Sequence, residues 1–150
     1  MPIPDFTAAG LLPPGIHPAT RPEVAGRFGC QNDRRVELWG KLEAFLDFAQ
    51  TFNLFDATYL DGSFVTDKAA PGDVDVVLVI QKANAVRLVT HANARQIMDT
   101  FAVKKTYEVH LFIQQPPCSM ADFFQSLRAD EAIRRNVAPD QRRGILEVAL

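Results

Sequence analysis

The sequence has no long apolar run, few cysteines and no basic start. Its longest aliphatic stretch, Val76 to Ile80, is far shorter than the ~20 residues of a membrane-spanning helix, so no membrane partner is expected. Cys30 and Cys118 lie outside any C-x-x-C or Cys/His cluster, which argues against a zinc site or a disulfide framework and favours buried or incidental thiols. No Lys or Arg precedes Arg21, so no secretory signal is expected and the default prediction is a cytoplasmic location.

An excess of positive charge is missing as well. The chain carries 16 Lys and Arg against 18 Asp and Glu, a formal net charge of −2, so no overall positive field attracts it to nucleic acid and any such partner must be bound locally. Its 47% hydrophobic and 23% charged residues are ordinary globular usage, which excludes disordered and fibrous classes. With 150 residues, no internal repeat and no linker, we expect a single domain over residues 1–150.

Proline is concentrated at the start of the chain, where residues 1–22 hold six of the ten prolines. Because proline fixes φ and removes an amide donor, this segment is predicted to be an extended arm. Apolar residues recur along it, so we expect a strap packed over the domain, with a partner-binding strand as the alternative.

Hydrophobic periodicity and β-branched runs predict alternating helices and strands. The expected helices cover about Asp33–Phe52, Asn84–Met98 and Ser119–Leu127, and the expected strands are Ala57–Asp61, Asp73–Ile80 and one within Val103–Ile113. Asn32 or Asp33 is the expected N-cap of the first helix, and Ser119 with Asp122 resembles a capping arrangement for the last. The tail, Gly144–Leu150, fits strand or helix, and an edge strand is favoured. The predicted fold class is α/β (α+β), a small mixed sheet flanked by helices.

Two aspartates open the strongest predicted strand. Residues i and i+2 of a strand point to the same face, about 6.6 Å apart along the axis, so Asp73 and Asp75 project together while Val74 and Val76 enter the opposite layer. Neighbouring carboxylates raise each other's pKa, and a divalent cation reverses that effect by favouring both ionised forms. The pair therefore predicts a metal site.

The turn before this strand carries Gly62 and Ser63. Glycine allows a ligand close to the backbone, while the adjacent amides and the Ser63 hydroxyl can donate hydrogen bonds to phosphate oxygens. Either motif alone is weak, since Gly-Ser occurs in many turns and Asp-x-Asp often lies on a solvated face. Their order and separation together predict a cleft for phosphate and metal.

The combined pattern resembles a known superfamily. Gly-Ser, nine intervening residues and then D-V-D-V-V at the head of an apolar strand are similar to the signature of the polymerase-beta-type nucleotidyltransferases. The fuller strings Y-L-D-G-S-F-V-T and P-G-D-V-D look more like small bacterial nucleotidyltransferase-like proteins without an assigned activity. Relatives by fold include nucleotidyltransferase toxins of toxin-antitoxin and abortive-infection systems. The resemblance is specific over residues 59–80 and elsewhere rests on element order.

The resemblance implies a role for each residue of the motif. Gly62 and Ser63 would hold a nucleoside triphosphate such as ATP, and Asp73 and Asp75 would bind two Mg²⁺ ions, with Mn²⁺ as the alternative. The superfamily takes a third carboxylate from a neighbouring strand, for which Glu108 is the best match and would also assist deprotonation of an acceptor hydroxyl.

Other residues near the motif have weaker assignments. The superfamily often has a basic residue soon after Gly-Ser, and this sequence offers Thr66 and Lys68 instead, of which Lys68 is equally explained as a surface lysine. His110 shares a face with Glu108 and either contacts substrate or is structural. Asp61 is expected to form a turn hydrogen bond rather than to bind metal.

The predicted reaction is metal-dependent transfer of a nucleoside monophosphate from a triphosphate to a hydroxyl of RNA, protein or a small molecule. The chain is short, so a protein partner or a homodimer is expected to assist recognition. Two basic pairs, Arg134–Arg135 and Arg142–Arg143, either meet RNA phosphates or are solvated. The alternatives are an inactive nucleotide-sensing or partner-binding module on the same fold, and metal-dependent phosphoester hydrolysis.

Overall fold

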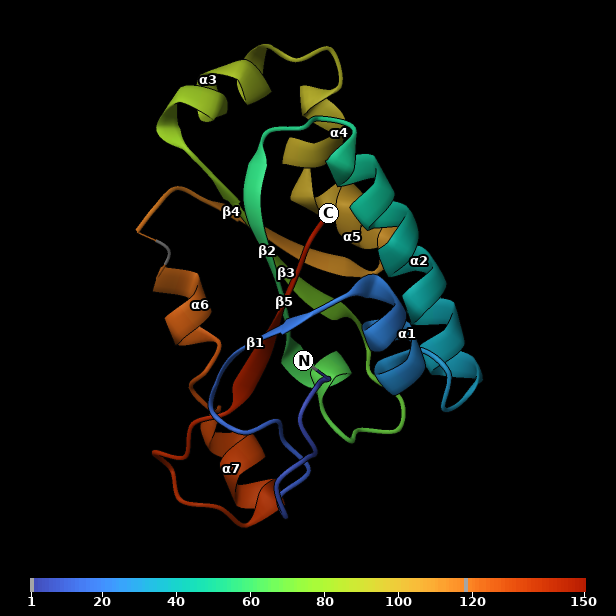
Figure 1. Cartoon of the computed structure of the whole chain (residues 1–150), viewed down its shortest axis with the longest axis vertical. Coiled ribbons are helices and arrows are strands. Elements are labelled where there is room, and N and C mark those ends of the chain that lie inside the picture. Colours follow the sequence, from blue (N-terminus) through green and yellow to red (C-terminus); the bar gives the residue numbers. More distant parts are fainter. Residues whose placement is uncertain (1, 118) are drawn as a thin grey trace.

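The structure, a computed structural model, describes residues 2–117 and 119–150, without the Ser119 side chain. Within these residues five strands form one sheet in the order β1-β5-β2-β3-β4 (Figure 1). The strands are β1 (Gly15–Ala19), β2 (Phe55–Asp61), β3 (Val74–Ile80), β4 (Val109–Gln114) and β5 (Gly144–Val148). A mixed sheet flanked by helices confirms the predicted α+β class. Cys118 and the Ser119 cap lie outside the described atoms.

The strand directions are mixed. β2 runs antiparallel to β3 and β5, whereas β3 is parallel to β4 and β1 is parallel to β5. The tail forms a strand, as favoured, but its predicted edge position was wrong. β5 lies inside the sheet because the start of the chain supplies β1 along its outer side.

The helices connect and cover these strands. They are α1 (Arg21–Phe28), α2 (Asp33–Gln50), α3 (Lys82–Thr90), α4 (Ala94–Met98), α5 (Thr100–Tyr107), α6 (Ser119–Phe123) and α7 (Ala129–Arg135), with a short 3₁₀ turn at Gly62–Val65. Asn32 caps α2, as expected, by accepting a hydrogen bond from the Arg35 amide. In the described part of the chain, no helix combines the length and apolar character that crossing a bilayer requires.

Two predicted element boundaries differ in the structure. The expected helix over Asn84–Met98 is divided into α3 and α4, because His91 leaves the helical conformation and its ring packs 4.6 Å from the Phe52 ring, centroid to centroid. The strand within Val103–Ile113 begins only at Val109. The residues before it form α5, which Asp99 caps by accepting a hydrogen bond from the Ala102 amide.

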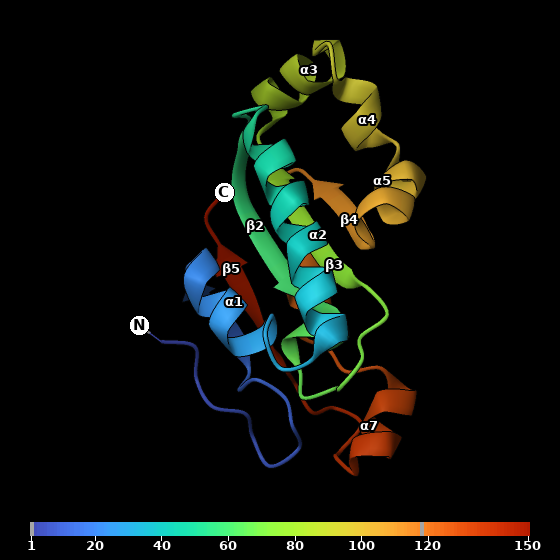
Figure 2. The same cartoon turned by 90° about the vertical axis from the view of Figure 1, so that its right-hand side faces the viewer.

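The hydrophobic core lies between the sheet and α2. Helices α1, α2 and α5 cover one face of the sheet, and α6 lies on the opposite side (Figures 1 and 2). The apolar stripe of α2 and alternate residues of β3 form one buried cluster, which includes Leu38, Leu42, Phe45, Leu46, Val74, Val76, Leu78 and Ile80. Because side chains alternate along a strand, Asp73 and Asp75 point away from α2, toward the side of α6.

The N-terminal arm is packed against the domain, as predicted for a strap. Leu11 and Leu12 are buried, and the Gly144 amide donates a hydrogen bond to the Leu12 carbonyl. The prediction that the arm is extended through residue 22 was wrong, because β1 joins the sheet and α1 begins at Arg21. Thr20 and Glu23 form a capping box there, and this satisfies the free amides of the helix start.

The first turn of α2 holds the loop that follows the Gly-Ser turn. Arg35 is 3% exposed, and its guanidinium donates hydrogen bonds to the carbonyl oxygens of Phe28, Phe64, Thr66 and Lys68. Asn32 donates to the Ala69 carbonyl, and Arg34 donates to those of Pro71 and Gly72. Both arginines at the start of this helix, Arg34 and Arg35, are therefore engaged by backbone carbonyl oxygens of the loop.

Replacing Arg35 with Met is expected to destabilise the protein by about 3 kcal/mol or more, because each buried carbonyl left without a donor costs about 1–3 kcal/mol. Urea unfolding followed by circular dichroism measures the loss. Arg87→Met, at an exposed position on α3, is the matched control and should change stability little. Equal stability of the two variants would contradict a clamping role for Arg35.

Candidate functional site

The Gly-Ser turn and the acidic pair meet in space. Asp61 at the end of β2 pairs with Asp75 of β3, and Gly62 follows with a φ of +79°. A Cβ atom at Gly62 would lie 2.3 Å from Oδ2 of Asp75, so only glycine fits both the backbone conformation and the space. The turn therefore lies directly against the second aspartate, which is the juxtaposition that the motif predicted.

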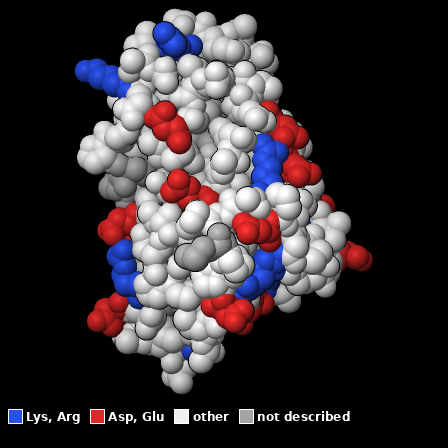
Figure 3. Space-filling view, in the orientation of Figure 1, with Lys and Arg blue, Asp and Glu red and all other residues white. Residues whose placement is uncertain are grey.

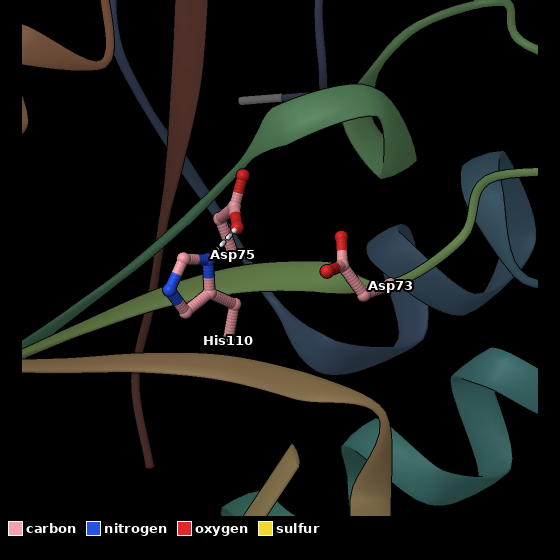
Figure 4. Close-up of side chains that lie close together, drawn as sticks. All are labelled: Asp73, Asp75 and His110. Atoms are coloured by element: carbon pink, nitrogen blue, oxygen red, sulfur yellow. Dashed lines mark ion pairs between the residues drawn. The ribbon is translucent and has the colours of Figure 1, made fainter. Parts of the chain in front are cut away.

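Asp73 and Asp75 gather with a histidine from the neighbouring strand. β3 and β4 pair in parallel with Asp75 opposite His110, and the Nδ1 atom of His110 lies 3.2 Å from Oδ1 of Asp75. One possible ligand atom from each of the three residues lies within 4.8 Å of the others. Figure 4 shows both aspartates on the same side of β3, with the imidazole facing Asp75.

Burial and charge perturb the acidic pair. Burial raises the pKa of Asp75 above its usual range, and the nearby Asp73 charge raises it further, whereas His110 and Lys104 lower it. Lys104 of α5 forms an ion pair with Asp73. In this arrangement the ammonium and imidazole groups partly neutralise two carboxylates that repel each other.

A third carboxylate lies beneath the pair. Asp61 is 0% exposed, and neither of its carboxylate oxygens has a hydrogen-bond partner among the described residues. Burial, followed by the Asp75 charge, raises the pKa of Asp61 well above its usual range, and Arg143 lowers it. The expected turn hydrogen bond was therefore wrong. Since residues opposite each other in an antiparallel pair share a face, Asp61 and Asp75 face the same side.

Glu108 does not join the cluster, so the expectation that it reaches the aspartates was wrong. It caps the C-terminus of α5 in the left-handed conformation, with a φ of 54°, one residue before β4 begins. Its carboxylate accepts hydrogen bonds from Arg34 and Lys41 of α2 at 2.9–3.1 Å. These contacts lower the pKa of Glu108 to about 2. Glu108 is an anchor between α5 and α2.

The remaining predicted residues divide between the cleft and the turn. A cleft of about 630 Å³ is lined by Gly62, Ser63, Lys68, Asp73 and Asp75, and its far wall comes from residues 123–134. Thr66 is instead 1% exposed. Its hydroxyl donates to the Ser63 carbonyl and accepts from the Lys68 amide. Thr66 therefore stabilises the turn and is not placed to contact phosphate.

The basic pairs of the C-terminal region are largely engaged within the protein. Arg143 is 8% exposed, and it donates to the Gly62 carbonyl at 2.5 Å. Arg135 contacts Asp67 and Glu131, and Arg142 contacts Asp122. On the face in Figure 3, acidic and basic side chains alternate, and neither sign forms a continuous surface among the coloured residues. An RNA-binding role for both pairs is not supported by these contacts.

The residues present suit a divalent cation. Carboxylate oxygens are ligands for Mg²⁺ and Mn²⁺, and an imidazole nitrogen is accepted by Mn²⁺ and other transition metals. The buried oxygens of Asp61, which lack partners among the described residues, add negative charge behind the pair. Asp73 and Asp75 are the carboxylates that would hold the ion, and His110 lies next to them.

Sequence reasoning underrated three residues of this region. His110 was kept out of the site although its strand register places it opposite Asp75, and the alternation of the strand was a signal for that face. The buried roles of Arg35 and Arg143 had no signal in the sequence, because nothing local distinguishes a buried arginine from a solvated one.

Replacing Glu108 with Gln is expected to destabilise the protein by about 1–2 kcal/mol at neutral pH, because Arg34 and Lys41 lose their ion-pair partner. Solvent screens these ion pairs, which limits the loss. The folded-state pKa is lowered, so the Glu108 contribution is full above the unfolded value of 4.5 and is lost as pH falls toward about 2. Urea unfolding across this window should show the two proteins converging at acid pH. Glu43→Gln, exposed on α2, is the control, and a difference independent of pH would contradict the assignment.

Replacing Asp61 with Asn is expected to change the pH dependence of stability in the opposite direction. The raised folded-state pKa of Asp61 means that its neutral form is favoured, so wild-type stability falls as pH rises above the unfolded value. The variant should therefore gain stability relative to wild type as pH rises above the unfolded value of 3.8. Asp56→Asn, exposed on the same strand, should show no such gain. If the stability of the Asp61→Asn variant and that of wild type changed with pH in the same way, the burial argument would be refuted.

Comparisons with known proteins give one finding. A search of curated proteins and a search of solved structures each return no match. A family model described as "Family of unknown function (DUF6932)" matches residues 4–149, which includes the arm, the Gly-Ser turn, the acidic pair and β5. Because the match covers almost the whole chain, the protein belongs to the DUF6932 family.

Proposed function

We propose that the protein is a metal-dependent nucleotidyltransferase that moves a nucleoside monophosphate from a nucleoside triphosphate to an acceptor hydroxyl. The observation that carries the proposal is the contact between Gly62 and Asp75, where an added Cβ would lie 2.3 Å from a carboxylate oxygen. That contact joins the phosphate half and the metal half of the sequence motif in one cleft. Neither half alone would support the assignment.

The two sides of the cleft have complementary roles in this proposal. Ser63 and Lys68 line it beside the turn, where a hydroxyl and an ammonium group bind phosphate oxygens. Asp73 and Asp75 hold Mg²⁺ or Mn²⁺. When bound, such an ion neutralises phosphate charge and activates the attacking hydroxyl. Arg143, fixed on the Gly62 carbonyl, adds positive charge behind the turn.

The proton acceptor in the proposed reaction is His110. Glu108 is held by Arg34 and Lys41, and its lowered pKa makes it a weak base. The His110 side chain is 53% exposed beside Asp75, so an acceptor hydroxyl can reach it. The hydroxyl oxygen bonds to the α-phosphorus, its proton passes to the imidazole, and pyrophosphate leaves with the electrons of the broken phosphorus–oxygen bond.

The proposed acceptor is a small molecule or a protein side chain rather than an extended RNA. The contacts of Arg135, Arg142 and Arg143 within the protein and the mixed charges in Figure 3 support this choice. A compact acceptor needs only the mouth of the cleft, whereas an RNA backbone needs a continuous basic path. A partner or second copy would complete the acceptor side.

A second candidate, an inactive nucleotide-binding module, is favoured by two contacts. Glu108, the expected third carboxylate, is bound to α2, and Lys104 already neutralises Asp73. A site so arranged would bind a triphosphate without supplying all the groups that transfer requires.

The first test is ligand-induced stabilisation. Mg²⁺ or Mn²⁺ with a nucleoside triphosphate at about 100 times its Kd should stabilise the folded protein by about 2.7 kcal/mol, a rise in Tm of several degrees. Asp75→Asn should abolish the rise, whereas Asp56→Asn should retain it. No rise with any of the four common triphosphates would sink both the transferase and the module.

Label transfer separates the two candidates. The protein is incubated with Mg²⁺ or Mn²⁺, each α-labelled triphosphate and fractionated protein, RNA or small molecules from cells. Transfer that Asp75→Asn eliminates supports the transferase. Binding without transfer or pyrophosphate release supports the module, and release of free nucleoside monophosphate shows hydrolysis.

A further inference from the structure

The far wall of the cleft is aromatic, in contrast to the acidic and polar wall around the turn. Phe123, Phe124 and Leu127 line it together with Ser126, Arg128, Glu131 and Arg134. Its volume of about 630 Å³ falls within the roughly 300–1,000 Å³ of sites for small ligands. A ligand that fills the cleft therefore meets the aspartates on one side, and on the other side it meets apolar rings beside the Arg134–Glu131 ion pair.

Phe123 is unusual because it combines this position with high exposure. It is 63% exposed at the end of α6, whereas the other phenylalanines of the cluster that reaches it, Phe112 and Phe124, are only partly exposed. An exposed phenylalanine ring forgoes the favourable burial of its apolar surface. A ring kept at the rim of a cleft is consistent with burial by a ligand.

The ring is held in place by a series of aromatic contacts that leads to the metal cluster. Phe123 packs on Phe124 at 5.3 Å between centroids and an interplanar angle of 79°. Phe124 packs on Phe112 at 5.3 Å, and Phe112 packs on His110 at 4.5 Å. This series connects the rim to the residue that contacts Asp75. Phe123 is therefore the exposed end of an aromatic cluster whose other end faces the acidic pair.

From this arrangement we propose that Phe123 is the base-stacking residue of the nucleotide site and that it accepts all four common bases. The inference rests on the proposed function, because it needs the phosphates to lie at Gly62 and Ser63. Every base has a π-face, so stacking on an aromatic side chain is tolerant of sequence. Arg128 contacts Asp130 and Arg134 contacts Glu131. The neutral polar side chain of this wall is Ser126, whose hydroxyl can both donate and accept a hydrogen bond and so selects no base.

Titration calorimetry that compares ligands with a nucleobase and a ligand without one tests this inference. In the presence of Mg²⁺ or Mn²⁺, wild type is titrated with each nucleoside triphosphate and with inorganic triphosphate, which has the phosphates and lacks the base. Stacking is worth about 1–3 kcal/mol, so nucleotides should bind about 5- to 150-fold more tightly than inorganic triphosphate. The four nucleotides should agree within about 10-fold, because stacking alone discriminates weakly.

Substitutions at Phe123 test whether its ring causes the tighter binding of nucleotides. Phe123→Ala should remove the nucleotide advantage and leave inorganic triphosphate binding unchanged, and Phe123→Trp should keep or increase it. Phe101→Ala is the matched control, because Phe101 is 81% exposed on α5 and does not line the cleft. Unchanged Tm in the absence of ligand confirms that the variants fold.

The possible outcomes distinguish failure of the stacking role from failure of the proposed function. If inorganic triphosphate binds in a manner that Asp75→Asn abolishes, but nucleotides have no advantage or Phe123→Ala retains it, the stacking proposal fails and the phosphate site stands. A preference above about 10-fold for one base refutes the tolerance. If neither nucleotide nor inorganic triphosphate binds, the proposed function and the stacking role fail together, and Phe123 is left for a protein partner.

Discussion

The hydrogen bonds of the buried Arg35 guanidinium are the constraint on which the candidate site depends. They fix the carbonyls of Phe64, Thr66 and Lys68, so the loop after the Gly-Ser turn cannot leave the first turn of α2. Since α2 is anchored by the core, the turn is held against Asp75. The proposed phosphate-binding residues lie on a loop, and that loop is attached to a helix and a strand of the core, which restrict its movement.

The same rigidity forces acidic groups together at an electrostatic cost. Asp61 faces Asp75 across a strand pair, and burial raises the pKa of both carboxyl groups. The Asp75 charge raises the pKa of Asp61 further, and the Asp73 charge raises that of Asp75 further. Arg143, His110 and Lys104 only partly compensate. Carboxyl groups perturbed in this way within a cleft are more typical of functional sites than of structural ones. Stability alone would favour apolar residues at these positions.

The sequence was sufficient for local features and insufficient for those set by packing. The alternation of β3 predicted that Asp73 and Asp75 share a face, and glycine at position 62 predicted a close approach. Both follow from backbone geometry within a few residues. Glu108 was misplaced because a left-handed residue at the end of α5 turned its side chain toward α2, and β5 became an inner strand because a distant segment paired with it. The burial of Arg35 likewise depends on carbonyls about 30 residues away in sequence, which local pattern does not encode.

His110, and not the expected Glu108, lies beside the acidic pair, and this difference changes the chemistry available there. A carboxylate would add a third negative charge and favour hard, oxygen-seeking ions, whereas an imidazole adds a neutral nitrogen when unprotonated and a competing charge when protonated. Because the ammonium of Lys104 pairs with Asp73 and the His110 imidazole lies against Asp75, a divalent ion held by the two carboxylates would displace the ammonium. In the proposed function, the imidazole is then left to take the proton of the acceptor hydroxyl.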